Sequence, residues 1–135
     1  DAQLLYDFGI KMGLAFQLQD DYLDVYGDPA VFGKKIGGDI LCNKKTFMLI
    51  TALSLAEGED KETLLNWLRA TDYVAEEKIQ SVTALYNKVG VPELCQARID
   101  AYYKEGLELL DKVNVESSLK EELKKFVCHL MDRKL

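Results

Sequence analysis

An apolar stretch near the start of this chain carries three carboxylates, and it constrains the fold more than any other feature of the sequence. The stretch runs from Gly13 to Tyr26, GLAFQLQDDYLDVY, and its acidic residues are Asp20, Asp21 and Asp24. An ionised carboxylate in an apolar setting is costly unless a cation or hydrogen-bond donors compensate it. The sequence therefore predicts a cation beside this segment.

The residues around this stretch predict one long helix. Residues 2–26 contain no proline, and apolar residues occur on nearly every side of a helical projection. Such a helix is expected to be central and buried rather than to lie on a surface. Gly27, Asp28 and Pro29 predict its end, because the residue before a proline disfavours helical geometry.

The remainder of the chain predicts further helices and no strands. After a loop rich in glycine and lysine (27–43), helices are expected over 44–57 and 60–70, then from Thr71 or Asp72 as the cap to 89, from Pro92 to 113, and from Ser118 to the C-terminus. Ser118 with Glu121 resembles a capping box. The predicted fold class is all-α, an antiparallel helical bundle that forms a single domain over residues 1–135.

Composition argues against several classes of protein. The formal net charge of -6 at pH 7 does not suit a binder of nucleic acid or anionic membranes, which needs a basic surface. Three scattered cysteines with no CxxC pair predict reduced thiols rather than a disulfide framework or a zinc site. No stretch reaches the roughly 18 continuous apolar residues of a membrane span. We therefore expect a cytoplasmic protein without an integral membrane segment.

The spacing of polar residues in the opening stretch indicates a metal site. Gln17, Asp20 or Asp21, and Asp24 are three or four residues apart, which places them on one face of a helix. Two carboxylates one turn apart can share Mg²⁺, which prefers oxygen ligands and often completes its shell with water and substrate phosphate. The expected cation is therefore Mg²⁺.

Basic residues follow the acidic stretch closely. Lys34 and Lys35 lie in the glycine-rich loop, and Lys44 and Lys45 come directly after it. Lysines that face the same cleft as the carboxylates would bind phosphate groups as point charges. An acidic helix followed by a basic loop predicts a site where a metal ion and a phosphorylated substrate meet.

A solvated helix face and an EF-hand both fit the acidic stretch less well than a Mg²⁺ site. A solvated face often carries carboxylates, but here the flanking residues include Phe16, Tyr22 and Tyr26, which do not suit such a face. An EF-hand needs alternating oxygen ligands around a glycine and a glutamate at its twelfth position, and this spacing is absent. A Mg²⁺ site is the favoured interpretation.

The segment Phe16–Asp24, FQLQDDYLD, resembles the second aspartate-rich motif of the trans-isoprenyl diphosphate synthases, the farnesyl and geranylgeranyl diphosphate synthase family. The similarity continues through GD at 27–28, GKKIGGDI at 33–40 and NKKT at 43–46. Several motifs in the same order and at matching spacing make this resemblance specific, and the chain beyond them carries weaker signatures.

The resemblance implies how metal and diphosphate would be held. Asp20, Asp21 and Asp24 would hold one Mg²⁺ that bridges to the diphosphate of an allylic substrate. Lys35 and Lys44 would contact that diphosphate directly. Metal and lysines together would stabilise the charge that develops on the leaving diphosphate.

The resemblance also implies the reaction and its remaining residues. Phe16 and Gln17 would line the cleft near the reacting carbons, and Asp39 would interact with water bound to the metal. The implied reaction is ionisation of the allylic diphosphate, attack by the double bond of isopentenyl diphosphate, and loss of a proton. Asp20, Lys35 and Gln17 are the predicted catalytic residues.

The resemblance covers only the C-terminal half of that family. Its members also carry a first aspartate-rich motif N-terminal to the second, whereas residues 1–15 contain only Asp1 and Asp7 as acids. We therefore expect a chain truncated at its N-terminus, with half of an active site and no turnover of its own. A non-catalytic partner subunit of a heteromeric prenyl synthase is the alternative.

Truncation has a further implied consequence. The first helix would expose apolar faces that the N-terminal half covers, and large apolar patches drive association. A homo-oligomer is therefore expected. Arg133 and Lys134 resemble a basic tail that folds over the diphosphate in some members of the family.

Overall fold

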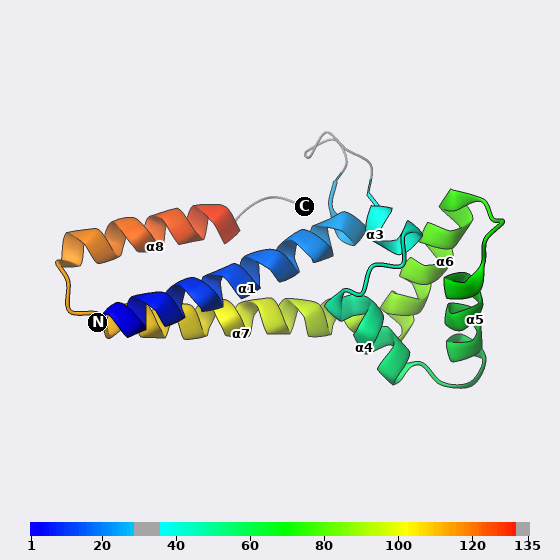
Figure 1. Ribbon diagram of the computed structural model, residues 1–135, viewed down its shortest axis with the longest axis horizontal. Helices are drawn as coiled ribbons and strands as arrows, with labels where there is room; N and C mark the ends of the chain where they lie inside the picture. Colours follow the sequence, from blue (N-terminus) through cyan, green and yellow to red (C-terminus); the bar gives the residue numbers. More distant parts are fainter. Residues whose placement is uncertain (29–35, 132–135) are drawn as a thin grey trace. The chain divides into compact units, whose positions relative to one another are not determined.

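The computed structural model describes residues 1–28 and 36–131 and contains no strand within these ranges (Figure 1). Its helices are α1 (Ala2–Tyr26), α3 (Gly38–Leu41), α4 (Phe47–Leu55), α5 (Gly58–Arg69), α6 (Ala75–Lys88), α7 (Val91–Asp111) and α8 (Ser117–Met131). The predicted all-α class is confirmed. Among the described residues, no helix combines the length and the apolar character needed to cross a membrane.

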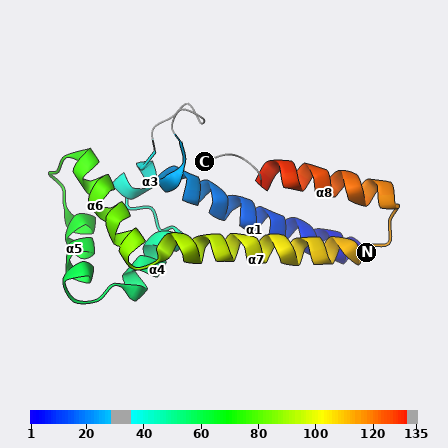
Figure 2. The same cartoon turned by 180° about the vertical axis from the view of Figure 1, so that it is seen from behind.

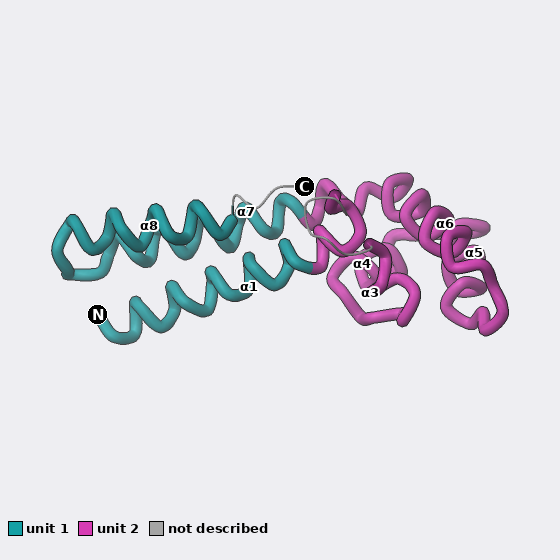
Figure 3. Tube along the Cα trace, turned by 90° about the horizontal axis from the view of Figure 1, so that it is seen from above, with its two compact units in different colours: residues 1–20, 96–134 teal, residues 21–95, 135 magenta. Residues whose placement is uncertain are grey.

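The chain forms two compact units (Figure 3). The first unit comprises residues 1–20 and the described residues from Gln96 onward, and the second unit comprises residues 21–95. The long helices α1 and α7 contribute residues to both units. The carboxylates of the opening stretch are divided accordingly: Asp20 belongs to the first unit, whereas Asp21 and Asp24 belong to the second.

The first unit is built from the N-terminal part of α1, most of α7, and α8, with α7 antiparallel to both of the others (Figures 1 and 2). Its core contains Phe8, Leu110 and Val127, one side chain from each helix. Gly106 allows α1 and α7 to approach closely, because a Cβ at this position would lie 2.5 Å from Met12 Cε. The antiparallel arrangement of helices that the sequence predicts is present in this unit.

Helix α6 organises the second unit, since α3, α4 and α5 all pack against it. Each of these helices contributes a buried side chain, namely Ile40, Met48, Leu64 and Val82. Full burial of one such side chain stabilises the fold by roughly 1.5–3 kcal/mol. Helix α3 and the start of α4 are therefore held on a packed helical base.

Two features between α1 and α4 differ from the prediction. The short helix α3 was not predicted, and it follows Gly37, whose φ of +94° favours glycine. Helix α4 begins at Phe47 rather than at residue 44, because Thr46 is its N-cap. The Thr46 Oγ1 accepts a hydrogen bond from the Leu49 N–H at 3.1 Å.

Two predicted caps are wrong. Helix α6 begins at Ala75, so neither Thr71 nor Asp72 caps it. Helix α8 begins at Ser117, which places Ser118 inside the helix instead of at its cap. Local capping preferences locate a helix end only to within a residue or two, and tertiary contacts decide the rest.

The prediction that the first helix is buried on all sides is wrong for the part of α1 in the first unit. Tyr6, Ile10 and Leu14 are exposed, with Tyr6 at 65%, whereas Ala15 is fully buried. The reason is that only one side of this helix packs on the core of the first unit. The spacing of four residues makes Tyr6, Ile10 and Leu14 one apolar stripe.

Candidate functional site

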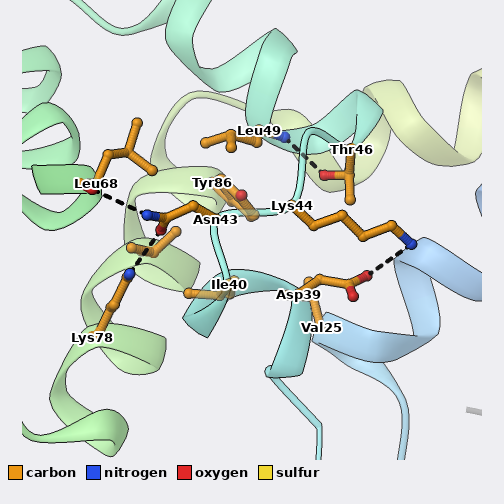
Figure 4. A pocket seen from close by; sticks show the side chains of 11 residues that line it. Val25, Asp39, Ile40, Asn43, Lys44, Thr46, Leu49, Leu68, Lys78 and Tyr86 are labelled. Carbon is orange, nitrogen blue, oxygen red and sulfur yellow. Dashed lines mark hydrogen bonds and ion pairs between the residues drawn. The ribbon is translucent and has the colours of Figure 1, made fainter.

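Lys44 lies between two carboxylates in the second unit. Its Nζ donates a hydrogen bond to Asp21 Oδ1 at 3.2 Å and lies 3.9 Å from Asp39 Oδ2, the second contact being drawn in Figure 4. The hydrogen bond to Asp21 and then the charges of Asp21 and Asp39 raise the pKa of Lys44. The Lys44 side chain is 53% exposed, so its ammonium also faces solvent. A cation therefore does compensate part of the acidic stretch.

The turn between α3 and α4 fixes the backbone of Lys44. Its N–H donates to the Asp39 carbonyl oxygen at 2.9 Å, and its own carbonyl oxygen accepts from the Thr46 N–H at 2.8 Å. The preceding residue, Asn43, has a φ of +56°, a left-handed conformation that asparagine adopts more readily than most residues. This tight turn directs Lys44 toward the end of α1.

Asp24 is bound to the start of α3. Its Oδ2 accepts a hydrogen bond from the Asp39 N–H at 2.8 Å, and its carbonyl oxygen accepts from the Gly37 N–H at 2.6 Å. A carboxylate at the start of a helix compensates free N–H groups. This structural contact of Asp24 was not expected from the sequence, which indicated only its spacing from Asp20.

A narrow pocket of about 10 Å³ adjoins Lys44 (Figure 4). It is lined by Val25, Asp39, Ile40, Asn43, Lys44, Thr46, Leu49, Leu68, Lys78, Val82 and Tyr86. A volume of this size holds about one water molecule. The pocket is therefore packing space behind the site and too small for a substrate.

Sequence reasoning missed two polar residues of this pocket. Lys78 is buried on α6, and its Nζ donates to Asn43 Oδ1 at 2.7 Å. Tyr86 is also buried, and burial, followed by the charge of Asp39, raises the pKa of its hydroxyl. No local signal could have found Lys78, because a lysine on an amphipathic helix is expected to face solvent.

The first unit contains the other predicted residues of the opening stretch. Asp20 and Gln17 are exposed there, and Phe16 is half-buried. Phe16 lines an apolar pocket of about 240 Å³ together with Met12, Gly13, Val127, Leu130 and Met131. The predicted roles of Asp20, Gln17 and Phe16 stay predictions.

Several predicted basic residues lie outside the described residues. These are Lys34 and Lys35 in the loop after α1, and Arg133 and Lys134 at the C-terminus. The roles that the resemblance implies for them stay predictions.

Comparison with known proteins decides the family. The family model for "Polyprenyl synthetase" matches residues 1–87. This chain belongs to the polyprenyl synthetase family. It is 36% identical over 118 residues to a short chain isoprenyl diphosphate synthase from Methanothermobacter thermautotrophicus, an alignment that covers 85% of this chain and 35% of that protein. It is 28% identical to a geranylgeranyl diphosphate synthase from Sulfolobus acidocaldarius, with coverage of 99% and 40%.

Solved structures of polyprenyl synthetases agree with this assignment. A geranylgeranyl pyrophosphate synthase from Corynebacterium glutamicum, complexed with isoprenyl diphosphate and magnesium, is similar with a TM-score of 0.86 and 30% identity. This similarity covers 98% of the present chain and 37% of that protein. The chain therefore spans between a third and two fifths of the length of these three relatives. The resemblance noted from the sequence is confirmed.

The carboxylates of this polyprenyl synthetase chain have the donor chemistry that Mg²⁺ requires. Asp21 and Asp39 both place an oxygen within 4 Å of the Lys44 ammonium, so a positive charge is already stable there. Over the described ranges, no group of three or more His, Cys, Asp or Glu side chains is arranged to hold a metal ion. Water or substrate phosphate would have to complete the shell, as is usual for Mg²⁺.

Proposed function

We propose that the complete protein carrying this chain is a trans-isoprenyl diphosphate synthase, which condenses an allylic diphosphate with isopentenyl diphosphate. Membership in the polyprenyl synthetase family supports the reaction class. The observation that carries the assignment of the site is the Lys44 ammonium between Asp21 and Asp39. It joins an exposed cation and oxygen ligands at one place, which is what recognition of a metal-bound diphosphate requires.

The acidic and basic residues have separate roles in this proposal. Asp20, Asp21 and Asp24 would hold Mg²⁺ together with water and substrate phosphate, and the bound ion would neutralise charge on the leaving diphosphate. Lys44 and Lys35 donate to the phosphate oxygens. The ion pair of Lys44 with Asp21 supports this role, because an exposed lysine can exchange a carboxylate for a phosphate at little cost.

In this proposal the walls of the cleft shield the reacting carbons from water. The allylic C–O bond breaks and its electron pair leaves with the diphosphate. The double bond of isopentenyl diphosphate then attacks the resulting cation, and a proton is lost to form the new double bond. Phe16 and Gln17 would line the cleft at this point, and an apolar wall excludes water that would otherwise quench the cation. Asp39 would orient water bound to the metal.

This chain covers only part of the length of its relatives, and this affects the activity expected of it alone. Because it spans 35–40% of the curated relatives named above, we assign turnover to the complete protein and expect none from residues 1–135 alone. A reducing, cytoplasmic location is part of the same proposal. It is supported by three cysteines that are all free, of which Cys95 is buried.

The experiment compares two lysines of the second unit that both form surface ion pairs. Lys44→Ala in the complete protein should raise KM for the allylic diphosphate about 10- to 100-fold, the loss of a hydrogen bond to a charged group worth about 1.5–3 kcal/mol. Lys88, whose Nζ lies 3.0 Å from Asp60 Oδ1, provides the matched control. Lys88→Ala should leave KM within about twofold of the unaltered protein, since a surface ion pair contributes little.

Two results would contradict the proposal. Equal KM values for both variants would show that Lys44 does not bind the diphosphate. The complete protein would also be assayed with Mg²⁺, isopentenyl diphosphate and allylic diphosphates of several lengths. Absence of product in this assay would contradict the proposed enzymatic function. Stimulation of a separate catalytic chain by this inactive protein would then favour the partner-subunit alternative.

A further inference from the structure

Lys78 is a buried cation in the second unit, with only 1% of its surface exposed. Its Nζ donates to Asn43 Oδ1 at 2.7 Å and to the Leu41 carbonyl oxygen at 3.4 Å. The same atom lies 4.7 Å from the centre of the Tyr73 ring. Over residues 1–28 and 36–131, no carboxylate forms an ion pair with Lys78.

A buried ammonium needs a reason, because an apolar side chain of similar volume would fill the same space without a desolvation cost. Its compensation here comes from two oxygen acceptors and an aromatic face. One acceptor belongs to Leu41, the last residue of α3, and the other to Asn43 in the segment that joins α3 to α4. Lys78 therefore directs its hydrogen bonds to the turn that precedes Lys44.

Asn43 connects Lys78 to this turn. Its Oδ1 accepts from Lys78, and its Nδ2 donates to the Leu68 carbonyl oxygen on α5 at 3.0 Å. Both ends of the amide are thus occupied by groups from packed helices, as Figure 4 shows. A residue held in this way cannot rotate without breaking two partly buried hydrogen bonds, and this stabilises the left-handed φ of +56°.

The backbone carries this constraint to the neighbouring residue. Lys44 follows Asn43 directly, and its N–H is bonded to the Asp39 carbonyl oxygen at 2.9 Å. The direction in which Lys44 leaves the turn is therefore set by the conformation of Asn43. Its Nζ then reaches Asp21 Oδ1 at 3.2 Å.

We infer that Lys78 is a positioning residue for diphosphate binding: through Asn43 it holds the α3–α4 turn so that Lys44 faces Asp21 and Asp39. This inference rests on the proposed function of Lys44. Lys78 itself is not expected to touch substrate, because it is buried and Figure 4 shows its side chain and that of the exposed Lys44 leading in different directions.

A double-mutant cycle in the complete protein tests the inference. Binding of inorganic pyrophosphate in the presence of Mg²⁺ is measured by calorimetry for the unaltered protein, Lys78→Met, Lys44→Ala and the double variant. Lys78→Met should weaken binding about tenfold when Lys44 is present. It should weaken binding less than about twofold when Lys44 is absent, because residues acting through one another are not additive.

A merely structural Lys78 would behave differently in this cycle. Lys78→Met would then weaken pyrophosphate binding by the same factor with Lys44 present and with Lys44→Ala. That result would overturn the inference while leaving Lys44 as a diphosphate ligand. Asn43→Gly is the second variant, since glycine keeps the left-handed φ and removes both side-chain hydrogen bonds. It should reproduce the pattern of Lys78→Met, and unchanged binding by this variant would also overturn the inference.

Crystal structures of the variants separate the inference from the proposed function. In Lys78→Met or Asn43→Gly the Lys44 Nζ should no longer lie within ion-pair distance of Asp21, whether or not the protein binds pyrophosphate. Retention of this ion pair in a folded variant would overturn the positioning role. Failure of the unaltered protein to bind pyrophosphate would instead contradict the proposed function alone.

Discussion

The carboxylate of Asp24 accepts a hydrogen bond from the backbone N–H of Asp39, with 2.8 Å between Asp24 Oδ2 and Asp39 N. This contact joins the last turn of α1 to the start of α3. A second bond, from the Gly37 N–H to the Asp24 carbonyl oxygen, reinforces it. An aspartate predicted to bind metal therefore also holds the segment that carries Asp39 and leads to Lys44.

Two substitutions of Asp24 separate these roles. Asp24→Ala removes the acceptor and should lower the free energy of unfolding by about 1–3 kcal/mol, measured by urea denaturation. Asp24→Asn keeps an oxygen acceptor and should cost less, but it should raise the Mg²⁺ concentration needed for pyrophosphate binding if Asp24 is also a ligand. Unchanged stability of Asp24→Ala would show that the hydrogen bond contributes nothing.

Gly37 should not tolerate a side chain. A Cβ at this position would lie 2.6 Å from Ile79 Cδ1, and the φ of +94° adds backbone strain. Gly37→Ala is expected to lower the free energy of unfolding by about 2–4 kcal/mol. Gly58 also has a positive φ but nothing near its Cβ position, so Gly58→Ala should show only the strain, about 1–2 kcal/mol. Equal costs for both variants would rule out the contact with Ile79.

The cysteines should differ in reactivity. Cys42 and Cys128 are exposed, whereas Cys95 is buried, and burial, followed by the charge of Asp21, raises its pKa from the usual 9.0 to about 11. At pH 8 a thiol reagent should label two thiols in the native protein and the third only after unfolding. Rapid labelling of Cys95 in the native state would contradict its burial.

The same thiol should affect stability at high pH. The raised pKa means that the folded state disfavours the Cys95 thiolate, so its contribution to stability is complete below pH 9 and is lost as the pH rises toward about 11. Cys95→Ala should show a weaker decline of stability over this range. An identical decline in the variant would assign the effect to other groups.

The exposed stripe of α1 should drive self-association of residues 1–135. Tyr6, Ile10 and Leu14 form one apolar face, and such faces associate in water. Sedimentation equilibrium should detect dimers or larger species, and Tyr6→Lys should reduce them. Phe126 on α8 is 61% exposed and serves as the control, because Phe126→Lys should leave the association unchanged. A stable monomer at high concentration would contradict the prediction.

Local patterns predicted the long helices well and the short segments poorly. The extent of α1 is as expected, since a proline-free stretch needs no partner to specify its bounds. The helix α3 was missed, because four residues give no periodic signal and Gly37 and Asp24 stabilise it from outside. The start of α6 was also misplaced, because its packing against α3, α4 and α5 and not a local capping preference decides where it begins.

Composition and periodicity were sufficient to predict the all-α class, and spacing was sufficient to single out the acidic stretch with its nearby lysines. The family followed from the resemblance of the motifs over 16–46 to a known family, and comparison with relatives confirmed it. Which cation meets which carboxylate depends instead on the folded arrangement, since Lys44 and Asp21 are 23 residues apart. The same holds for Lys78, which lies beneath Asn43 although 35 residues separate them. Such contacts form when helices pack and bury polar groups together, and no local preference along the chain specifies that packing.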